Sequence, residues 1–72
     1  MEKQLIQLAE QGNSRAMAYY GNFLMAGYKK LKIKKDQRKG KSYIINALNQ
    51  GDRVAGVVEG IWRDYWRYYL NN

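Results

Sequence analysis

A short pattern of residues occurs twice in this chain, 39 positions apart, and it restricts the possible folds more than any other feature. Each copy has an apolar pair, a Gln-Gly pair, a polar residue, an alanine and a second glycine. A glycine after an apolar run ends a helix and reverses the chain, and the small residues that follow let helices approach closely. Recurrence at such a period indicates stacked two-helix units. The matching residues are Leu8-Ala9 and Ala47-Leu48, Gln11-Gly12 and Gln50-Gly51, Ala16 and Ala55, and Gly21 and Gly60.

The spacing of apolar residues predicts four helices, and no proline interrupts them. Asn13 or Ser14 can cap the second helix, Asp36 the third and Asp52 the fourth. We therefore expect an all-α fold, a short α-solenoid of antiparallel helix pairs that forms a single domain over residues 1–72. The predicted helices span about residues 2–11, 14–27, 37–50 and 53–70, with a basic loop at residues 28–36.

The apolar positions also predict which side chains form the core. On the second helix Tyr19 and Tyr20 are expected to pack inside, with hydroxyl groups that reach water. On the fourth helix the same role is expected for Ile61, Trp62 and Tyr65. In the basic loop only Leu31 and Ile33 can anchor the chain. Aliphatic and basic residues alternate over residues 31–34 as in a strand, but four residues are too few to distinguish a strand from a loop.

Positive charge is concentrated in one segment. The net charge is +7, and residues 29–41 carry all of it, because eight basic residues there meet one acid, whereas the remaining five bases and five acids cancel. Such a cluster favours contact with nucleic-acid phosphates or an acidic protein surface, and the alternative is a solvated loop that keeps the protein soluble. The basic residues are Lys29, Lys30, Lys32, Lys34, Lys35, Arg38, Lys39 and Lys41.

Aromatic residues are concentrated near the C-terminus. One helix of so small a domain cannot bury every ring, so we expect some of Trp66, Tyr68 and Tyr69 to stay exposed. Trp, Tyr and Arg are the residue types that dominate binding energy at interfaces. The open end of an unfinished solenoid could also pair with a second copy of the chain. The candidate partner-binding residues are Trp62, Tyr65, Trp66, Arg67, Tyr68 and Tyr69.

Several classes of site are not expected. The chain has no cysteine and no histidine, so the usual ligands of zinc, iron–sulfur clusters and haem are missing. We expect no metal, no cofactor and no catalytic residue, since Glu59 and Asp64 do not share a helix face and Gly40-Lys41-Ser42 lacks the upstream glycine of a phosphate-binding loop. Neither a membrane-spanning stretch nor a signal peptide is recognisable, which favours the cytoplasm.

The repeated residues resemble those of the Sel-one-like repeat family, a relative of the tetratricopeptide repeats. The resemblance covers almost the whole chain, as a trailing helix, one full repeat and the leading helix of the next. The matching positions are Ala9-Glu10-Gln11-Gly12-Asn13 in the turn between repeats, Ala16, Gly21 and Gly27 in the first helix, Ile33, Asp36, Lys39 and Gly40 around the start of the second, and Tyr43, Ala47 and Gly51 toward its end.

The chain departs from the family's pattern at several positions, and its repeat is longer. The resemblance implies a scaffold of helix pairs that binds other proteins on a concave face and is not a catalyst. The departures are the extra residues between Gly27 and Ile33, Leu24 and Arg63 in place of an aromatic residue, and Gly40 and Leu48 in place of alanines.

Two functions are compatible with these features. The leading hypothesis is a small non-enzymatic adaptor or inhibitor that binds a larger, acidic protein, with a homodimer through the last helix as a further possibility. The alternative is a nucleic-acid-binding protein that contacts phosphates through residues 29–41. Binding to a membrane surface is less favoured, because the lysines and the aromatic residues lie on different segments.

Overall fold

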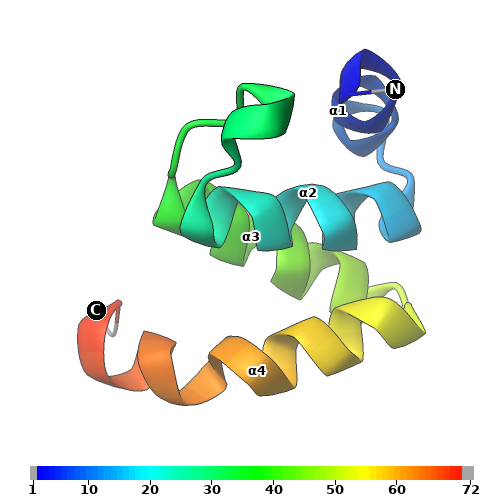
Figure 1. Cartoon of the computed structure of the whole chain (residues 1–72). Helices are drawn as coiled ribbons and strands as arrows, with labels where there is room; N and C mark the ends of the chain where they lie inside the picture. The colour runs from blue at the N-terminus through cyan, green and yellow to red at the C-terminus, as the bar shows by residue number, and fades with distance from the viewer. Residues whose placement is uncertain (1, 71–72) are drawn as a thin grey trace.

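The computed structural model describes residues 2–70, with side chains from residue 4 onward, and shows an all-α arrangement of four helices packed in antiparallel pairs (Figure 1). The predicted fold class is confirmed. Every helix begins at the predicted residue and ends one residue earlier than predicted. In α2, α3 and α4 the last predicted residue is the C-cap. The elements are α1 (Glu2–Glu10), α2 (Ser14–Ala26), the 3-10 helix η1 (Lys29–Leu31), α3 (Gln37–Asn49) and α4 (Arg53–Tyr69).

The helices stack in chain order. Figure 1 shows α2 and α4 running in the same direction on the front of the molecule, with α3 returning between them in the opposite direction. The first helix, α1, packs on α2. The segment that contains η1 lies on the far side of α2 from α4. The loop around η1 and the last helix are therefore at opposite ends of the stack, whereas the end of the charged segment, in α3, lies beside α4.

The two turns between helices have the same backbone geometry. Gly12 and Gly51 have positive φ angles of 92° and 86°, which strain any residue with a side chain. Their N–H groups donate to the carbonyl oxygens of Ala9 and Leu48, at 3.0 Å and 2.8 Å. These glycines therefore reverse the chain as the sequence predicts.

The residue after each glycine caps the helix that follows. Asn13 is the N-cap of α2, and its Oδ1 accepts a hydrogen bond from the N–H of Ala16 at 3.0 Å. Asp52 does the same for α4, accepting from the N–H of Ala55 at 3.1 Å. Both alanines are buried. The 39-residue repeat thus preserves the turn, the cap and the small core residue.

Two glycines allow α2 and α3 to pack in backbone contact. A Cβ on Gly40 would lie 2.7 Å from the backbone oxygen of Gly21, and a Cβ on Gly21 would lie 2.7 Å from Cγ1 of Ile44. Close packing at this crossing gives the molecule its deepest core. The largest fully buried side chains are those of Met17, Met25 and Ile44.

The basic loop is an ordered structure held by the two apolar anchors that the sequence predicts, since Ile33 is buried and Leu31 is partly buried against the core. Tyr28 and Ile33 form an isolated antiparallel bridge, in which each N–H donates to the other's carbonyl oxygen at 2.8 Å and 3.0 Å. The side chain of Ile33 is buried, and the ring of Tyr28 stacks on Phe23 with centroids 4.8 Å apart. The N–H of Asp36 then donates to the carbonyl oxygen of Leu24 at 2.8 Å. These contacts hold the loop against α2.

Three expectations about the core were wrong. Tyr19 is exposed on α2, whereas its neighbour Tyr20 is buried as expected. Ile61 is exposed on α4, because none of the described helices covers that side of α4. No atom of a neighbouring element lies within 4 Å of where a Cβ on Gly60 would be, so Gly60 mediates no close helix approach. A helix equivalent to α3 would be needed to pack on it.

Candidate partner-binding surfaces

Three aromatic side chains of α4 face the rest of the protein. The indole Nε1 of Trp62 donates to Oδ1 of Asn22 in α2 at 2.8 Å. The Tyr65 hydroxyl and the Gln37 side chain in α3 are hydrogen-bonded at 2.9 Å. Trp66 is buried, with only 4% of its surface exposed. These rings dock α4 onto the stack, which confirms the core role expected for Trp62 and Tyr65.

Trp66 was expected to be a candidate for partner contact, but the structure places it in the core. Its Nε1 lies 3.3 Å from Sδ of Met25, which is itself fully buried. The ammonium group of Lys41 lies 5.5 Å from the centre of the ring, close enough for a cation–π contact. The ring is therefore unavailable to a partner while α4 stays docked.

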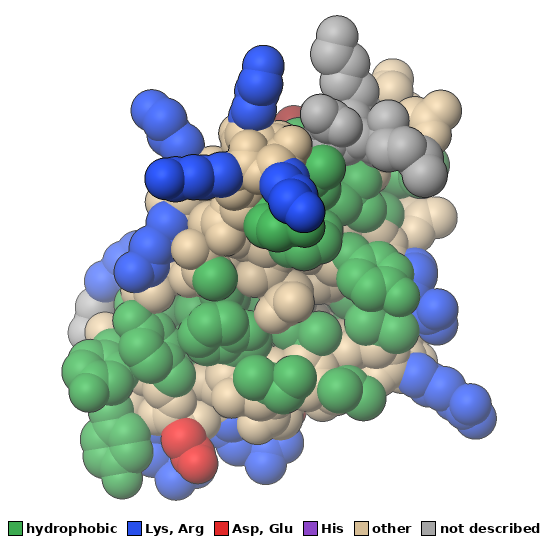
Figure 2. All heavy atoms as spheres, in the orientation of Figure 1, with side chains coloured by type: hydrophobic (Ala, Val, Ile, Leu, Met, Phe, Trp, Pro, Cys, Tyr) green, Lys and Arg blue, Asp and Glu red, His purple; other side chains and the backbone are tan. Residues whose placement is uncertain are grey.

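A different stripe of α4 is apolar and exposed. Val57, Ile61, Tyr68 and Tyr69 have 66%, 68%, 77% and 71% of their surface exposed. The first three are spaced by four and seven residues, which places them on one side of the helix. The same spacing places one exposed acid, Asp64, between Ile61 and Tyr68. The expected exposure of Tyr68 and Tyr69 is confirmed. Figure 2 shows hydrophobic side chains gathered on the face in view, with an acidic side chain among them where Figure 1 places the C-terminal end of α4.

The repeat explains why this stripe is exposed to solvent. Val57 corresponds to Ala18, 39 residues earlier, which is fully buried. Ile61 corresponds to Asn22, whose side chain receives the hydrogen bond from α4. The side of α2 that contacts α4 is thus equivalent to the exposed side of α4. Sequence reasoning missed Val57, although the change from alanine to valine at matched positions was a usable signal.

The polar side of α4 carries paired charges. Arg63 forms a two-point ion pair with Glu59, with the closest contact at 2.7 Å, and this hydrogen bonding lowers the pKa of the Glu59 carboxyl. The same pair raises the pKa of Arg63. Arg67, proposed from the sequence for partner contact, lies 3.9 Å from Asp64 in an exposed pair. Because the charges balance along this side, α4 contributes little to the net charge.

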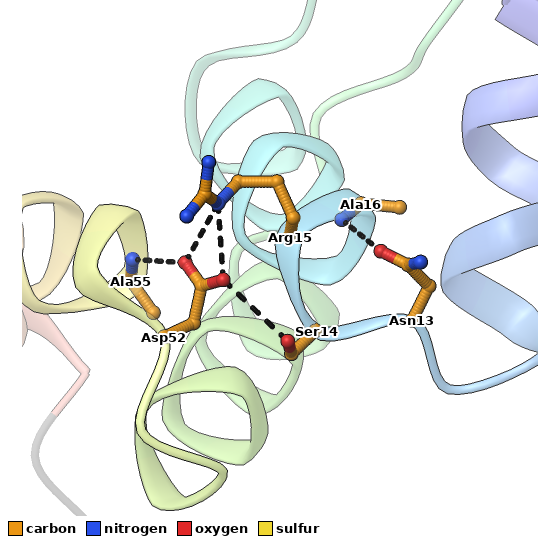
Figure 3. A network of polar contacts seen from close by, with 6 residues as sticks. All are labelled: Asn13, Ser14, Arg15, Ala16, Asp52 and Ala55. Atoms are coloured by element: carbon orange, nitrogen blue, oxygen red, sulfur yellow. Dashed lines mark hydrogen bonds and ion pairs between the residues drawn. The ribbon is translucent and has the colours of Figure 1, made fainter.

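The N-terminus of α4 is tied to α2 through Asp52 (Figure 3). The Nε of Arg15 donates to both carboxylate oxygens, at 3.0 Å and 3.2 Å, and the Ser14 hydroxyl lies 3.5 Å away. Desolvation of the carboxylate opposes its ionisation, but the hydrogen bonds from Ala55 and Arg15 prevail and lower the pKa of Asp52. This network has a structural role at the junction of the two helix caps.

The lysines of the basic segment have no ion-pair partner among residues 4–70. The only acid within the segment, Asp36, accepts a hydrogen bond from the N–H of Lys39 as the N-cap of α3. The Lys39 ammonium lies 5.8 Å from the centre of the Tyr20 ring. Figure 2 shows Lys and Arg side chains projecting from the part of the molecule where Figure 1 places η1. The positive field of this segment is therefore directed to solvent.

Half of the predicted basic residues surround a hollow, and the others do not. Lys29, Lys30, Arg38 and Lys41 lie outside it. Sequence reasoning missed its apolar floor, because α1 reaches this place only through tertiary packing. The hollow is lined by Ile6, Tyr20, Leu24, Ile33, Lys32, Lys34, Lys35, Asp36 and Lys39.

Two kinds of feature are missing from the described residues. Within residues 4–70 no group of three or more His, Cys, Asp or Glu side chains is placed to hold a metal ion. None of the described helices is long and apolar enough to cross a membrane.

Comparison with known proteins adds no further identification. No family model, curated protein or solved structure matches the chain.

Proposed function

We propose that this chain is a non-enzymatic protein-binding module, a small adaptor or inhibitor that docks on a larger protein through α4. The observation that carries the proposal is the exposure of Val57 and Ile61 at positions whose equivalents on α2, Ala18 and Asn22, face the rest of the stack. A helix of the partner would occupy the place of the next helix in the stack. The resemblance to Sel-one-like repeats, which bind other proteins, agrees with this proposal.

The energetics favour such a contact. Fully burying a valine or isoleucine side chain stabilises an interface by about 1.5–3 kcal/mol, and a tyrosine adds a large rigid surface at low entropic cost. The stripe contains one acid, Asp64, which pairs with Arg67, and the Arg63–Glu59 pair lies beside it. An apolar centre with a polar rim is the usual anatomy of a protein interface.

The basic segment would attract the partner rather than hold it. The lysines of the loop around η1 lie on the far side of α2 from α4, so they act on an approaching acidic surface through the long-range field, whereas Lys41 in α3 lies beside Trp66. Charges of this kind change the association rate and its salt dependence more than the lifetime of the complex.

The test is affinity capture of the tagged chain from cells that naturally contain it, with nuclease treatment. Ile61→Asp should abolish capture of the partner, because it places a charge in the apolar stripe. The matched control is Leu8→Asp, which changes a partly exposed leucine on α1. Circular dichroism checks that both variants are folded. Equal capture by the wild type and the folded Ile61→Asp variant would refute the proposal.

A second copy of the chain is the other possible occupant of the stripe. Residues 52–70 contain three acids and three arginines, so charge does not oppose self-association through α4. Sedimentation equilibrium distinguishes the two cases, because a homodimer would dissociate on dilution and in the Ile61→Asp variant, without any second protein.

Nucleic-acid binding remains the alternative function, and the observation that favours it is the lysine cluster without ion-pair partners in the described part of the chain. It requires affinity for DNA or RNA that falls steeply with salt. It also requires loss of binding when Lys30, Lys32 and Lys34 are changed to glutamate. Failure to shift any DNA or RNA at low salt would exclude this function.

A further inference from the structure

A second recognition surface lies between α1, α2 and the start of α3, away from the exposed stripe of α4. Its floor is apolar and comes from three parts of the chain: Ile6 in α1, Tyr20 and Leu24 in α2, and Ile33 in the basic loop. Leu24, Ile33 and Tyr20 are buried, so the floor is well packed. The hollow therefore has a rigid base on which an apolar group could rest.

The rim of this hollow is strongly positive. Four lysines and one acid line it, which gives a net charge of +3 (four minus one). The acid, Asp36, is the N-cap of α3, and its carboxylate is engaged with the N–H of Lys39. Lys39 is held over the Tyr20 ring, whereas Lys34 and Lys35 project as exposed side chains. A concave, low-dielectric floor beneath such a rim focuses the positive potential on any bound ligand.

The floor of the hollow distinguishes between two kinds of anionic ligand, a nucleic acid and an acidic peptide. Single-stranded nucleic acids gain their affinity from bases that stack on free aromatic faces. Here Tyr20 is buried and packs against Tyr43 with ring centroids 5.2 Å apart, and Tyr28 already stacks on Phe23. The rest of the floor is aliphatic. A branched aliphatic side chain fits this surface better than a nucleobase.

We infer that the hollow binds an acidic peptide segment, which places one large aliphatic side chain on the floor and its flanking carboxylates at Lys32, Lys34, Lys35 and Lys39. This inference deepens the proposed protein-binding function, because it names a second contact and the chemistry of the partner there. It does not require the exposed stripe of α4. The two surfaces can therefore fail or succeed independently.

The test is fluorescence anisotropy with the full chain at about 0.15 M salt, where charges farther away than about 8 Å are largely screened. The probe is a labelled peptide of aspartates and glutamates with one central leucine. Replacing that leucine with glycine should weaken binding about tenfold, as expected for loss of a buried leucine side chain. A single-stranded oligonucleotide of equal charge is the comparison probe and should bind less tightly than the leucine peptide.

Matched variants separate the hollow from general charge. The double variant Lys34→Glu and Lys35→Glu should weaken peptide binding about tenfold or more, since each reversal places a like charge beside the ligand. The control, Lys29→Glu and Lys30→Glu, makes the same change in charge outside the hollow and should weaken binding about threefold or less. All four side chains are exposed, so the fold should survive, and circular dichroism verifies it.

Four results would overturn the inference: no measurable peptide binding, equal binding of the leucine and glycine peptides, equal losses in the two double variants, or tighter binding of the oligonucleotide. The Ile61→Asp variant should bind the peptide with unchanged affinity. Suppose that Ile61→Asp leaves both peptide binding and capture of the natural partner unchanged. Only the role of α4 is then refuted, and the inference about the hollow stands. Loss of peptide binding in folded Ile61→Asp would contradict the separation of the two surfaces.

Discussion

The backbone oxygen of Gly21 in α2 lies 2.7 Å from the point where a β-carbon on Gly40 of α3 would stand. Neither helix can therefore carry a side chain at this crossing without moving apart. The contact brings Ile44 into full burial beside α2. Because α3 supports both α2 and α4, the crossing fixes the position of the last helix and of its exposed stripe.

Gly40→Ala should destabilise the protein by about 2 kcal/mol, because the added methyl group forces two backbones apart in a close-packed core. Gly60→Ala is the matched control from the second copy of the repeat. No atom lies within 4 Å of its added Cβ, so it should stabilise the protein by about 0.5–1 kcal/mol through helix propensity. Urea denaturation followed by circular dichroism measures both. Equal effects of the two variants would contradict the packing described at Gly40.

Trp66→Ala should destabilise the protein by about 3–5 kcal/mol, because it removes a buried ring and leaves a cavity beside Met25. Such a loss is a large part of the total stability of a small domain. Tyr68→Ala, two residues away and exposed, should change stability by about 0.5 kcal/mol or less. The melting temperatures of the two variants and the wild type, measured by thermal unfolding, check this prediction. If Trp66→Ala unfolded at the wild-type temperature, the ring could not be part of the core.

The carboxylate of Asp52 should make stability depend on pH in the acid range. Its pKa is lowered in the folded state from an ordinary value of 3.8, so its stabilising contribution is complete above that value and is lost as the pH falls through the folded-state pKa. Asp52→Asn keeps a cap for α4 but has no charge for Arg15. The wild type should melt at a higher temperature than Asp52→Asn near neutral pH, and the difference should shrink in strong acid.

The difference in melting temperature between the wild type and Asp52→Asn reports on Asp52 alone. The pKa of Glu59 is also lowered, by Arg63, but that pair is present in both proteins and its effect cancels in the difference. A difference in melting temperature that stayed constant down to strong acid would show that the charge of Asp52 does not stabilise the fold.

Added salt should stabilise the protein. The lysines of residues 29–41 repel one another, and raising the ionic strength from about 0.01 M to about 0.15 M shortens the screening length from about 30 Å to about 8 Å. The melting temperature should therefore rise over this range in sodium chloride. The double variant Lys29→Gln and Lys30→Gln should show a smaller rise. A melting temperature that fell with salt would mean that attractive ion pairs outweigh this repulsion.

The local features of the fold were predictable from the sequence because each depends on neighbouring residues. Gly12 and Gly51 adopt positive φ angles that other residues avoid, and Asp52 meets the free N–H groups at the start of its helix. The concentration of charge in residues 29–41 follows from composition alone. These signals act within one or two helical turns, so no tertiary information was needed to read them.

The tertiary structure decided which predicted positions became surfaces. Ile61 and Trp66 are both apolar residues of α4, yet 68% of one and 4% of the other is exposed. Gly21 and Gly60 occupy equivalent places in the repeat, but α3 packs only on the first. The sequence by itself determined four helices, the N-caps of three of them, their turns and one cationic segment. Which faces are covered depends on how many helices surround each one, and the period of a single helix carries no information about its neighbours.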